Sequence, residues 1–194
     1  MGKFAIIVGI PGVGKTTVLD VLLNLAKDSG IRASVENMGS LMLEAAKEAG
    51  TSIGRDKMRT LSLQEQAKLR MKAIKKLVER KSANDLTILD THFLIRSKGG
   101  YLVGLPKDLL DAVGPEYFGI IEASVQDILS RRAVDATRSR DEVNEEEVKL
   151  EQDLTRASVF LLAALYNANV IRVTNEQGKA SESGRKFYDF LLRG

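Results

Sequence analysis

A glycine-rich octapeptide near the start of the chain lies directly between an apolar run and an amphipathic pattern. The apolar run covers residues 4–8, and five consecutive hydrophobic residues are typical of a strand buried on both faces. After the octapeptide, hydrophobic residues recur with the spacing of one helix face, at Val18, Val21, Leu22, Leu25 and Ala26. A strand, a tight loop and a helix in this order predict the first unit of an α/β domain with a parallel sheet.

The octapeptide itself matches the phosphate-binding pattern G-x-x-x-x-G-K-[S/T], from Gly9 to Thr16. Glycines let successive backbone N–H groups converge on phosphates, and the start of the following helix adds positive potential. We expect Lys15 to contact the β- and γ-phosphates of a nucleoside triphosphate and the Thr16 hydroxyl to ligate Mg²⁺. The alternative is a glycine-rich turn with a solvated lysine, but the match lies between a strand and a helix, as a P-loop requires.

Apolar runs and helical patterns alternate along the rest of the chain. Strands are expected at 33–36, 86–90, 117–123 and 170–173, and helices at 41–49, 63–78, 125–133, 145–166 and 183–192. The alternation predicts helices on both faces of a parallel sheet, with a ligand bound beyond the carboxyl ends of the strands. Asp90 ends one of these apolar runs, so we expect it at the same edge as the P-loop.

Composition excludes several classes of protein. Hydrophobic residues make up 44% and charged residues 28% of 194 residues, as in a globular chain of one domain. No apolar run approaches the roughly 20 residues that span a bilayer, and no signal-peptide pattern is present, so we expect a soluble, cytoplasmic protein. The absence of cysteine excludes disulfides and thiolate metal sites. The net charge of +3 suits an anionic ligand but is too small to indicate nucleic-acid binding.

Two groups of arginines favour a small kinase over other P-loop proteins. The base-reading sequence N-K-x-D of GTPases is absent. Arg55 and Arg59 bracket part of a helical segment that could receive a phosphate acceptor. A second group lies between the strand at 117–123 and the long helix, and consists of Arg131, Arg132, Arg138 and Arg140.

Five strings, in this order, resemble the archaeal-type adenylate kinases, a family of P-loop nucleoside monophosphate kinases. They are G-I-P-G-V-G-K-T-T at 9–17, R-D-x-M-R-x-L-S at 55–62, D-T-H-x-x-I-R at 90–96, G-Y-L-x-G-L-P at 100–106 and R-x-x-D-x-T-R-x-R at 132–140. The resemblance covers nearly the whole chain. It implies a P-loop nucleoside monophosphate kinase fold with a five-stranded parallel sheet, helices on both faces, a helical AMP-binding insert and a short lid without zinc.

The resemblance also implies how one domain is divided and what it does. The core is expected at 1–36, 82–130 and 143–194, the AMP-binding insert at about 37–81 and the lid at about 131–142. The implied reaction is reversible transfer of the γ-phosphoryl group from Mg-ATP to AMP, giving two ADP, with Mg²⁺ as cofactor. This reaction serves adenine nucleotide homeostasis. No stable nucleic-acid partner or membrane is expected, and the family tends toward homotrimers.

Site residues follow from the resemblance, residue by residue. Catalytic roles are expected for Lys15, Arg132, Arg138 and Arg140. ATP is expected to contact Gly9, Ile10, Pro11, Gly12, Val13, Gly14, Lys15, Thr16 and Thr17. The AMP phosphate is assigned to Arg59 and Arg96, with Arg55 as a further candidate, since guanidinium forks bind phosphate oxygens bidentately. Mg²⁺ is assigned to Thr16 and, through water, to Asp90.

Structural alternatives stand beside these roles. Arg55 and Arg59 also fit the solvated start of a helix, and Asp90 also fits a helix cap. The arginine group after residue 130 is interleaved with carboxylates, as in a salt-bridged helix face. His92, the only histidine, receives no catalytic role, because phosphoryl transfer depends mostly on positioning and charge neutralisation.

Two other functions fit the P-loop. One is a kinase for another small acceptor, which rates with AMP, CMP, UMP and GMP would distinguish. The other is a P-loop ATPase switch that acts on an RNA or protein partner, for which ATP turnover without an acceptor would be the sign.

Overall fold

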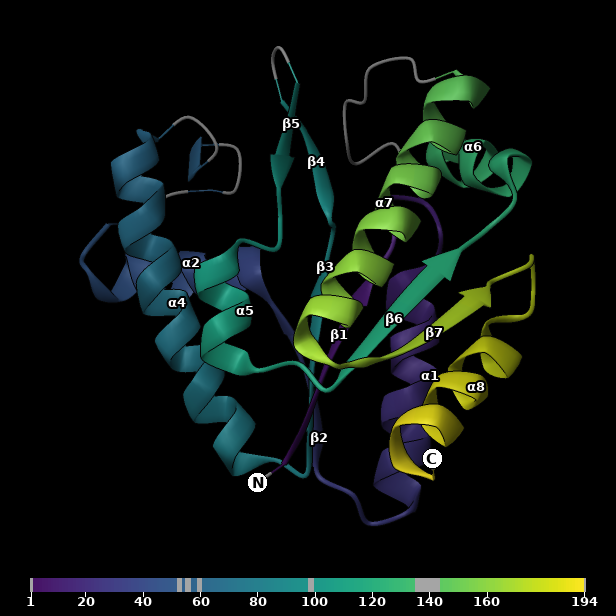
Figure 1. The fold of residues 1–194 in the computed structure, drawn as a ribbon, viewed down its shortest axis with the longest axis horizontal. Coiled ribbons are helices and arrows are strands. Elements are labelled where there is room, and N and C mark those ends of the chain that lie inside the picture. The colour runs from purple at the N-terminus through teal and green to yellow at the C-terminus, as the bar shows by residue number, and fades with distance from the viewer. Residues whose placement is uncertain are drawn as a thin grey trace.

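The computed structural model describes residues 2–51, 54, 57–58, 61–97, 100–134 and 144–193. Its centre is a parallel sheet of five strands in the order β2-β3-β1-β6-β7 (Figure 1). The strands are β1 (Lys3–Val8), β2 (Ala33–Asn37), β3 (Leu86–Thr91), β6 (Tyr117–Glu122) and β7 (Asn169–Thr174). Because β1 lies between β3 and β6, the chain changes direction across the sheet at β1, and the predicted five-stranded parallel sheet is confirmed.

Helices cover both faces of this sheet (Figure 1). On one face lie α1 (Lys15–Asp28), α6 (Val125–Val134) and α8 (Ala180–Leu192). On the other face lie α2 (Met38–Glu48), α4 (Leu63–Ala83), α5 (Lys107–Val113) and α7 (Glu145–Tyr166). The helices expected from the sequence are all present, with ends that differ by a few residues.

The alternating direction of side chains in β1 divides the core into two halves. Ala5 and Ile7 pack in a cluster with α1 and α8, whereas Phe4 and Ile6 pack in a second cluster with α2, α4 and α7. All four side chains are fully buried. The continuous apolar run therefore has the two covered faces that it predicted.

Local capping explains where two of the long helices begin. The Ser62 hydroxyl accepts a hydrogen bond from the Glu65 amide, and the Glu65 carboxylate accepts one from the Ser62 amide, so α4 starts with a capping box. Asn144 and Glu147 form the same arrangement at the start of α7. This second cap fixes the first turn of α7 directly after residues 135–143.

Three elements were not expected from the sequence. They are an antiparallel hairpin of β4 (Leu94–Ser97) and β5 (Gly100–Val103), and the short helix α5. All four residues of β5 are exposed, so this strand lacks the buried run that marks the central strands. Apolar pairs on either side of Gly99 and Gly100 carry the signal of a hairpin that could have been recognised.

None of the helices in the described part of the chain combines the length and the hydropathy needed to cross a bilayer.

Leu22 is the residue of α1 whose truncation should most clearly test this core, since its side chain is fully buried against the sheet. We expect Leu22→Ala to lower the free energy of unfolding by about 2–5 kcal/mol, because it removes buried methyl groups and leaves a cavity. Urea denaturation followed by circular dichroism measures this loss. Asn24→Ala, at an exposed position two residues further along α1, is the matched control and should change stability by less than about 0.5 kcal/mol.

Candidate active site

The P-loop lies at the carboxyl end of β1, where the strand order changes direction. Gly12 and Gly14 have φ angles of 96° and 84°, in the left-handed region that side chains disfavour. A Cβ atom at Gly14 would also lie 2.5 Å from Nδ2 of Asn175. Glycine is therefore favoured at Gly14 both by the turn and by the close approach of the buried Asn175 side chain.

Lys15 begins α1, and its ammonium group lies over the loop rather than in solvent. Its side chain is 8% exposed, and Nζ donates to the Gly9 carbonyl at 2.8 Å. Nζ also lies 3.1 Å from Nδ1 of His92 and 3.8 Å from Oδ1 of Asp90. Three segments that are distant in sequence thus meet at the expected P-loop lysine.

His92 is hydrogen-bonded at the P-loop, a neighbour that the sequence analysis did not predict. Nδ1 lies 2.7 Å from the Gly9 carbonyl oxygen as well as close to Lys15. The single histidine therefore touches the P-loop itself. The signal for this contact was its place two residues after Asp90, at the end of β3.

Thr16 and Asp90 supply the oxygen atoms that were expected to serve Mg²⁺. Thr16 is exposed in the first turn of α1, and the Asp90 side chain is 21% exposed at the end of β3. Hydroxyl and carboxylate oxygens are the donors that a hard cation such as Mg²⁺ prefers. Within the described ranges, no three His, Cys, Asp or Glu side chains gather as a metal site. The Thr16 hydroxyl and the Asp90 carboxylate have the chemistry to bind such an ion together with phosphate oxygens and water.

Two arginines of α6 reach the outer side of the P-loop. Arg132 donates from Nε to the Pro11 carbonyl at 2.9 Å, and Arg131 donates from Nη1 to the Gly12 carbonyl at 3.3 Å. Both also face carboxylates, Arg131 at 3.8 Å from Asp127 and Arg132 at 3.6 Å from Glu151. Arg131 and Arg132 thus take part in ion pairs, as in the alternative of a salt-bridged helix face. Their hydrogen bonds nevertheless place both guanidinium groups at the phosphate loop.

Asn175 is a contact of the P-loop that the sequence analysis missed. It follows β7, is 4% exposed, and donates from Nδ2 to the Val13 carbonyl at 2.8 Å. Its backbone carbonyl accepts a hydrogen bond from Arg131 at 3.2 Å, so it joins β7 to α6 as well as to the loop. An asparagine directly after an apolar strand was the signal that could have pointed to it.

Several expected site residues lie outside the described residues. They are Arg55, Arg59, Arg138 and Arg140. Arg96 lies in β4, where its backbone pairs with Tyr101, but its side chain is outside the described part of the structure. The predicted roles of these five arginines stay predictions.

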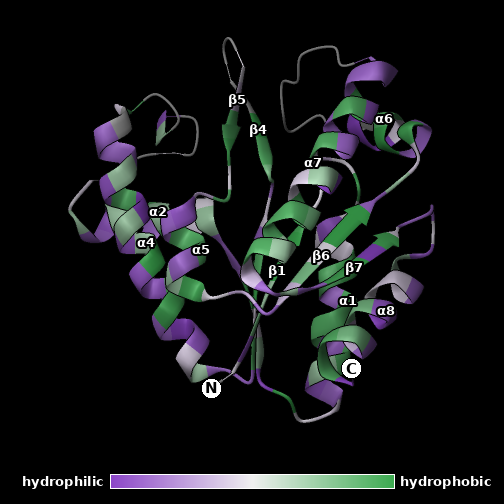
Figure 2. Ribbon diagram, viewed as in Figure 1, coloured by the Kyte–Doolittle hydropathy of each residue, from purple (hydrophilic) through white to green (hydrophobic). Residues whose placement is uncertain are grey.

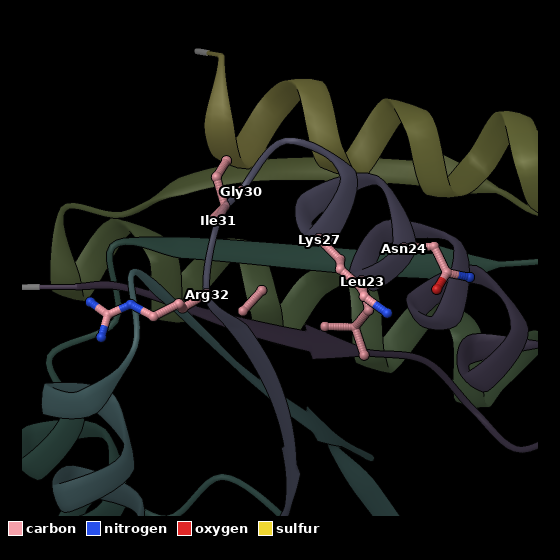
Figure 3. Close-up of a pocket in the computed structure, with 7 residues that line it drawn as sticks. Leu23, Asn24, Lys27, Gly30, Ile31 and Arg32 are labelled. Atoms are coloured by element: carbon pink, nitrogen blue, oxygen red, sulfur yellow. The ribbon is translucent and has the colours of Figure 1, made fainter.

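A hollow of about 480 Å³ lies elsewhere, between the end of α1 and the start of β2 (Figure 3). Because β2 begins there, the hollow lies at the amino ends of the parallel strands, whereas the P-loop lies at their carboxyl ends. Arg32 points away from Lys27 and Asn24, and it is paired with Asp85 at 2.9 Å. The polar groups of this hollow do not converge, so it does not compete with the P-loop as the candidate site.

The fold and this loop define a P-loop kinase, and comparisons with known proteins agree. A family model described as "AAA domain" matches residues 8–149. An adenylate kinase of Thermococcus onnurineus is 39% identical over 176 residues, which are 91% of this chain and 88% of that protein. An adenylate kinase of Thermoplasma acidophilum is 38% identical over 92% of this chain and 93% of that protein. An adenylate kinase of Sulfurisphaera tokodaii is 34% identical over 98% and 100%, respectively.

The chain therefore belongs to the adenylate kinase family, which confirms the resemblance found in its sequence, and it is an enzyme of the phosphotransferase class. The crystal structure of an unliganded sugar kinase from Janibacter sp. HTCC2649 covers all of this chain and 95% of that chain. Its TM-score of 0.49 and identity of 14% are too low to add to the assignment.

Replacement of Asn175 should show how far the P-loop depends on its outer contacts. Asn175→Ala leaves the Val13 carbonyl without its donor, so we expect a loss of about 1–3 kcal/mol of stability and a several-fold rise in the KM for ATP. Thermal denaturation and steady-state kinetics measure the two effects. Glu176→Ala, at the exposed neighbouring position, is the control. If both variants have the wild-type melting temperature and KM, the contact has no role in shaping the loop.

Proposed function

We propose that the chain catalyses reversible transfer of the γ-phosphoryl group from Mg-ATP to AMP, giving two ADP. The observation that carries the proposal is the placement of Lys15, with Asp90 nearby and Arg131 and Arg132 against the same loop. This concentration of positive charge at the switch in strand order suits a triphosphate donor. We place the reaction in the cytoplasm, where free adenine nucleotides are produced and used.

The donor site works by positioning and by electrostatics. Amides of the loop and Lys15 would bind the β- and γ-phosphates, and the exposed Thr16 hydroxyl and Asp90 would hold Mg²⁺, Asp90 through water. When bound, this ion neutralises charge that develops on the phosphate oxygens. Lys15 carries three N–H donors, so it can keep the Gly9 carbonyl while turning another donor toward a phosphate oxygen. Its position over the loop is therefore largely formed before the donor binds.

The acceptor is assigned to the helical segment between β2 and β3. We propose residues 37–81 as the AMP-binding insert, with Arg59, Arg96 and the weaker candidate Arg55 at the AMP phosphate. The insert is attached to the sheet by Arg80 of α4, which binds Glu36 at the end of β2 and Glu44 of α2. The hydrogen bond with Glu36 raises the pKa of Arg80.

The lid is assigned to residues 131–142, where Arg132, Arg138 and Arg140 would stabilise the transferring phosphoryl group. Arg132 belongs to α6 and already contacts the loop through Pro11. We propose that closure of this segment excludes water, so that AMP rather than water accepts the phosphoryl group.

A coupled assay of ADP formation from ATP and AMP tests the proposal directly. We expect AMP to be the best acceptor among AMP, CMP, UMP and GMP. Lys15→Ala should lower kcat by roughly 100-fold or more, because the ammonium group balances charge that develops in the transition state. Lys27→Ala, an exposed lysine of the same helix, is the matched control and should keep full activity.

Three outcomes of this assay would contradict the proposal. A preference for another acceptor would favour a different small-acceptor kinase. ATP turnover without any acceptor, stimulated by RNA, would favour a P-loop switch with a macromolecular partner. Wild-type turnover in Lys15→Ala would remove the P-loop assignment.

We also propose that the chain forms a homo-oligomer, and a trimer is the form that the family resemblance favours. The support is an exposed apolar stripe on the outer face of α7, formed by Leu150, Leu154, Ala157, Leu161 and Leu165. The four leucines are 40–67% exposed, and Figure 2 shows hydrophobic residues along α7 in front of the sheet. Exposed apolar stripes of this length are typical of helices that pack against a partner.

Light scattering after size-exclusion chromatography tests the stripe. We expect the wild type to have the mass of an oligomer and Leu161→Glu to have the mass of a monomer, because a charge in an apolar interface is not solvated. Met71→Glu, at a 46% exposed position of α4, is the matched control and should not change the mass. A wild type that is monomeric at all concentrations, or a Leu161→Glu variant with the wild-type mass, would contradict self-association through α7.

A further inference from the structure

We propose that Glu151 of α7 is a positioning residue of the donor site and acts through Arg132. The inference rests on the proposed function, because it concerns the same phosphate site. Glu151 lies in none of the sequence strings that resemble the family, and the argument for it comes from packing, burial and charge.

Arg132 is held on two sides. Its Nε donates to the Pro11 carbonyl of the P-loop at 2.9 Å, and its Nη2 lies 3.6 Å from Oε2 of Glu151. The stem of the side chain packs against the loop as well, since a Cβ atom at Gly12 would lie 3.2 Å from Cγ of Arg132. A planar guanidinium that is fixed along one edge by the loop and faced by a carboxylate has a defined direction.

Because Arg132 and Glu151 are both buried, the charge of the Glu151 carboxylate acts strongly on the Arg132 guanidinium. The side chains of Arg132 and Glu151 are only 10% and 7% exposed. Solvent therefore screens the two charges weakly, and a guanidinium without its counter-charge would turn toward water or toward another anion. Glu151 is an opposite charge placed to hold Arg132 beside Pro11.

The position of the pair in the fold connects it to the segment assigned as the lid. Arg132 lies in the last turn of α6, and Glu151 lies in the second turn of α7. These helices flank residues 135–143, so the ion pair joins the two ends of that segment at the P-loop. Glu151 thereby contributes to the position of the Arg132 guanidinium and to the packing of α6 against α7.

Glu151→Gln separates charge from shape, because glutamine keeps the size and one acceptor oxygen of glutamate. We expect kcat to fall about tenfold, since an arginine that is displaced by a fraction of an ångström aligns the phosphoryl group less well. The KM for ATP should not rise, because the change removes a negative charge near a triphosphate site. A general loss of structure would not produce this split between kcat and KM.

A double-mutant cycle with Arg132→Ala tests whether Glu151 acts through Arg132. We expect Glu151→Gln to lower kcat about tenfold in the wild type and less than about twofold in the Arg132→Ala background. Glu146→Gln, the same change at an exposed position of α7, is the matched control and should leave kcat unchanged in both backgrounds. Thermal denaturation of every variant identifies any that fails to fold. If Glu151→Gln does not fold, Glu151→Asp, which keeps the charge on a shorter side chain, takes its place in the same cycle and should lower kcat by about threefold.

Three results would overturn the proposal. They are an equal fall in kcat in both backgrounds, a rise in the KM for ATP with unchanged kcat, and an Arg132→Ala variant with wild-type kcat. ADP formation by the unmodified enzyme is measured in the same assay. This measurement tests the proposed function independently of the double-mutant cycle.

Discussion

The P-loop depends on hydrogen bonds to its carbonyl groups. The carbonyls of Gly9, Pro11, Gly12 and Val13 accept from Lys15, Arg132, Arg131 and Asn175, respectively. Three of these donors are cations, and they come from α1 and α6, while the amide comes from the end of β7. With its carbonyls bound on the outside, the loop can direct N–H groups toward an anion without leaving acceptors unpaired. The positions of α6 and β7 relative to β1 thus shape the donor site.

Much of the fold could be predicted because burial leaves a local trace. Residues 4–8 form one apolar run since both faces of β1 are covered, and α7 was predicted with its observed ends since Asn144 and Tyr166 bound a clear pattern. The hairpin of β4 and β5 was missed because both strands have only four residues and β5 is exposed along its whole length. The hydrophobic periodicity of a segment indicates which of its faces is buried. It gives no signal for a strand that is exposed on both faces.

The candidate site was predictable only in part, for a related reason. Lys15 and Thr16 belong to one continuous string, so their chemistry could be read from adjacent residues. Asn175 meets Val13 from 162 positions away in the chain, and Glu151 meets Arg132 from a different helix. Nothing in the sequence around Asn175 or Glu151 marks these contacts. The role of Arg132 was suggested by family resemblance, but its bond to Pro11 is a property of tertiary packing alone.

The chain has a single histidine, and its ring nitrogen lies 3.1 Å from the ammonium group of the P-loop lysine. In nuclear magnetic resonance, one imidazole gives one set of ring signals, which need no assignment by mutagenesis. Those signals come from a group that also touches the Gly9 carbonyl, so their chemical shifts respond to any movement of the loop or the lysine. The enzyme thus contains its own spectroscopic reporter of donor-site occupancy, placed within the site and requiring no added label.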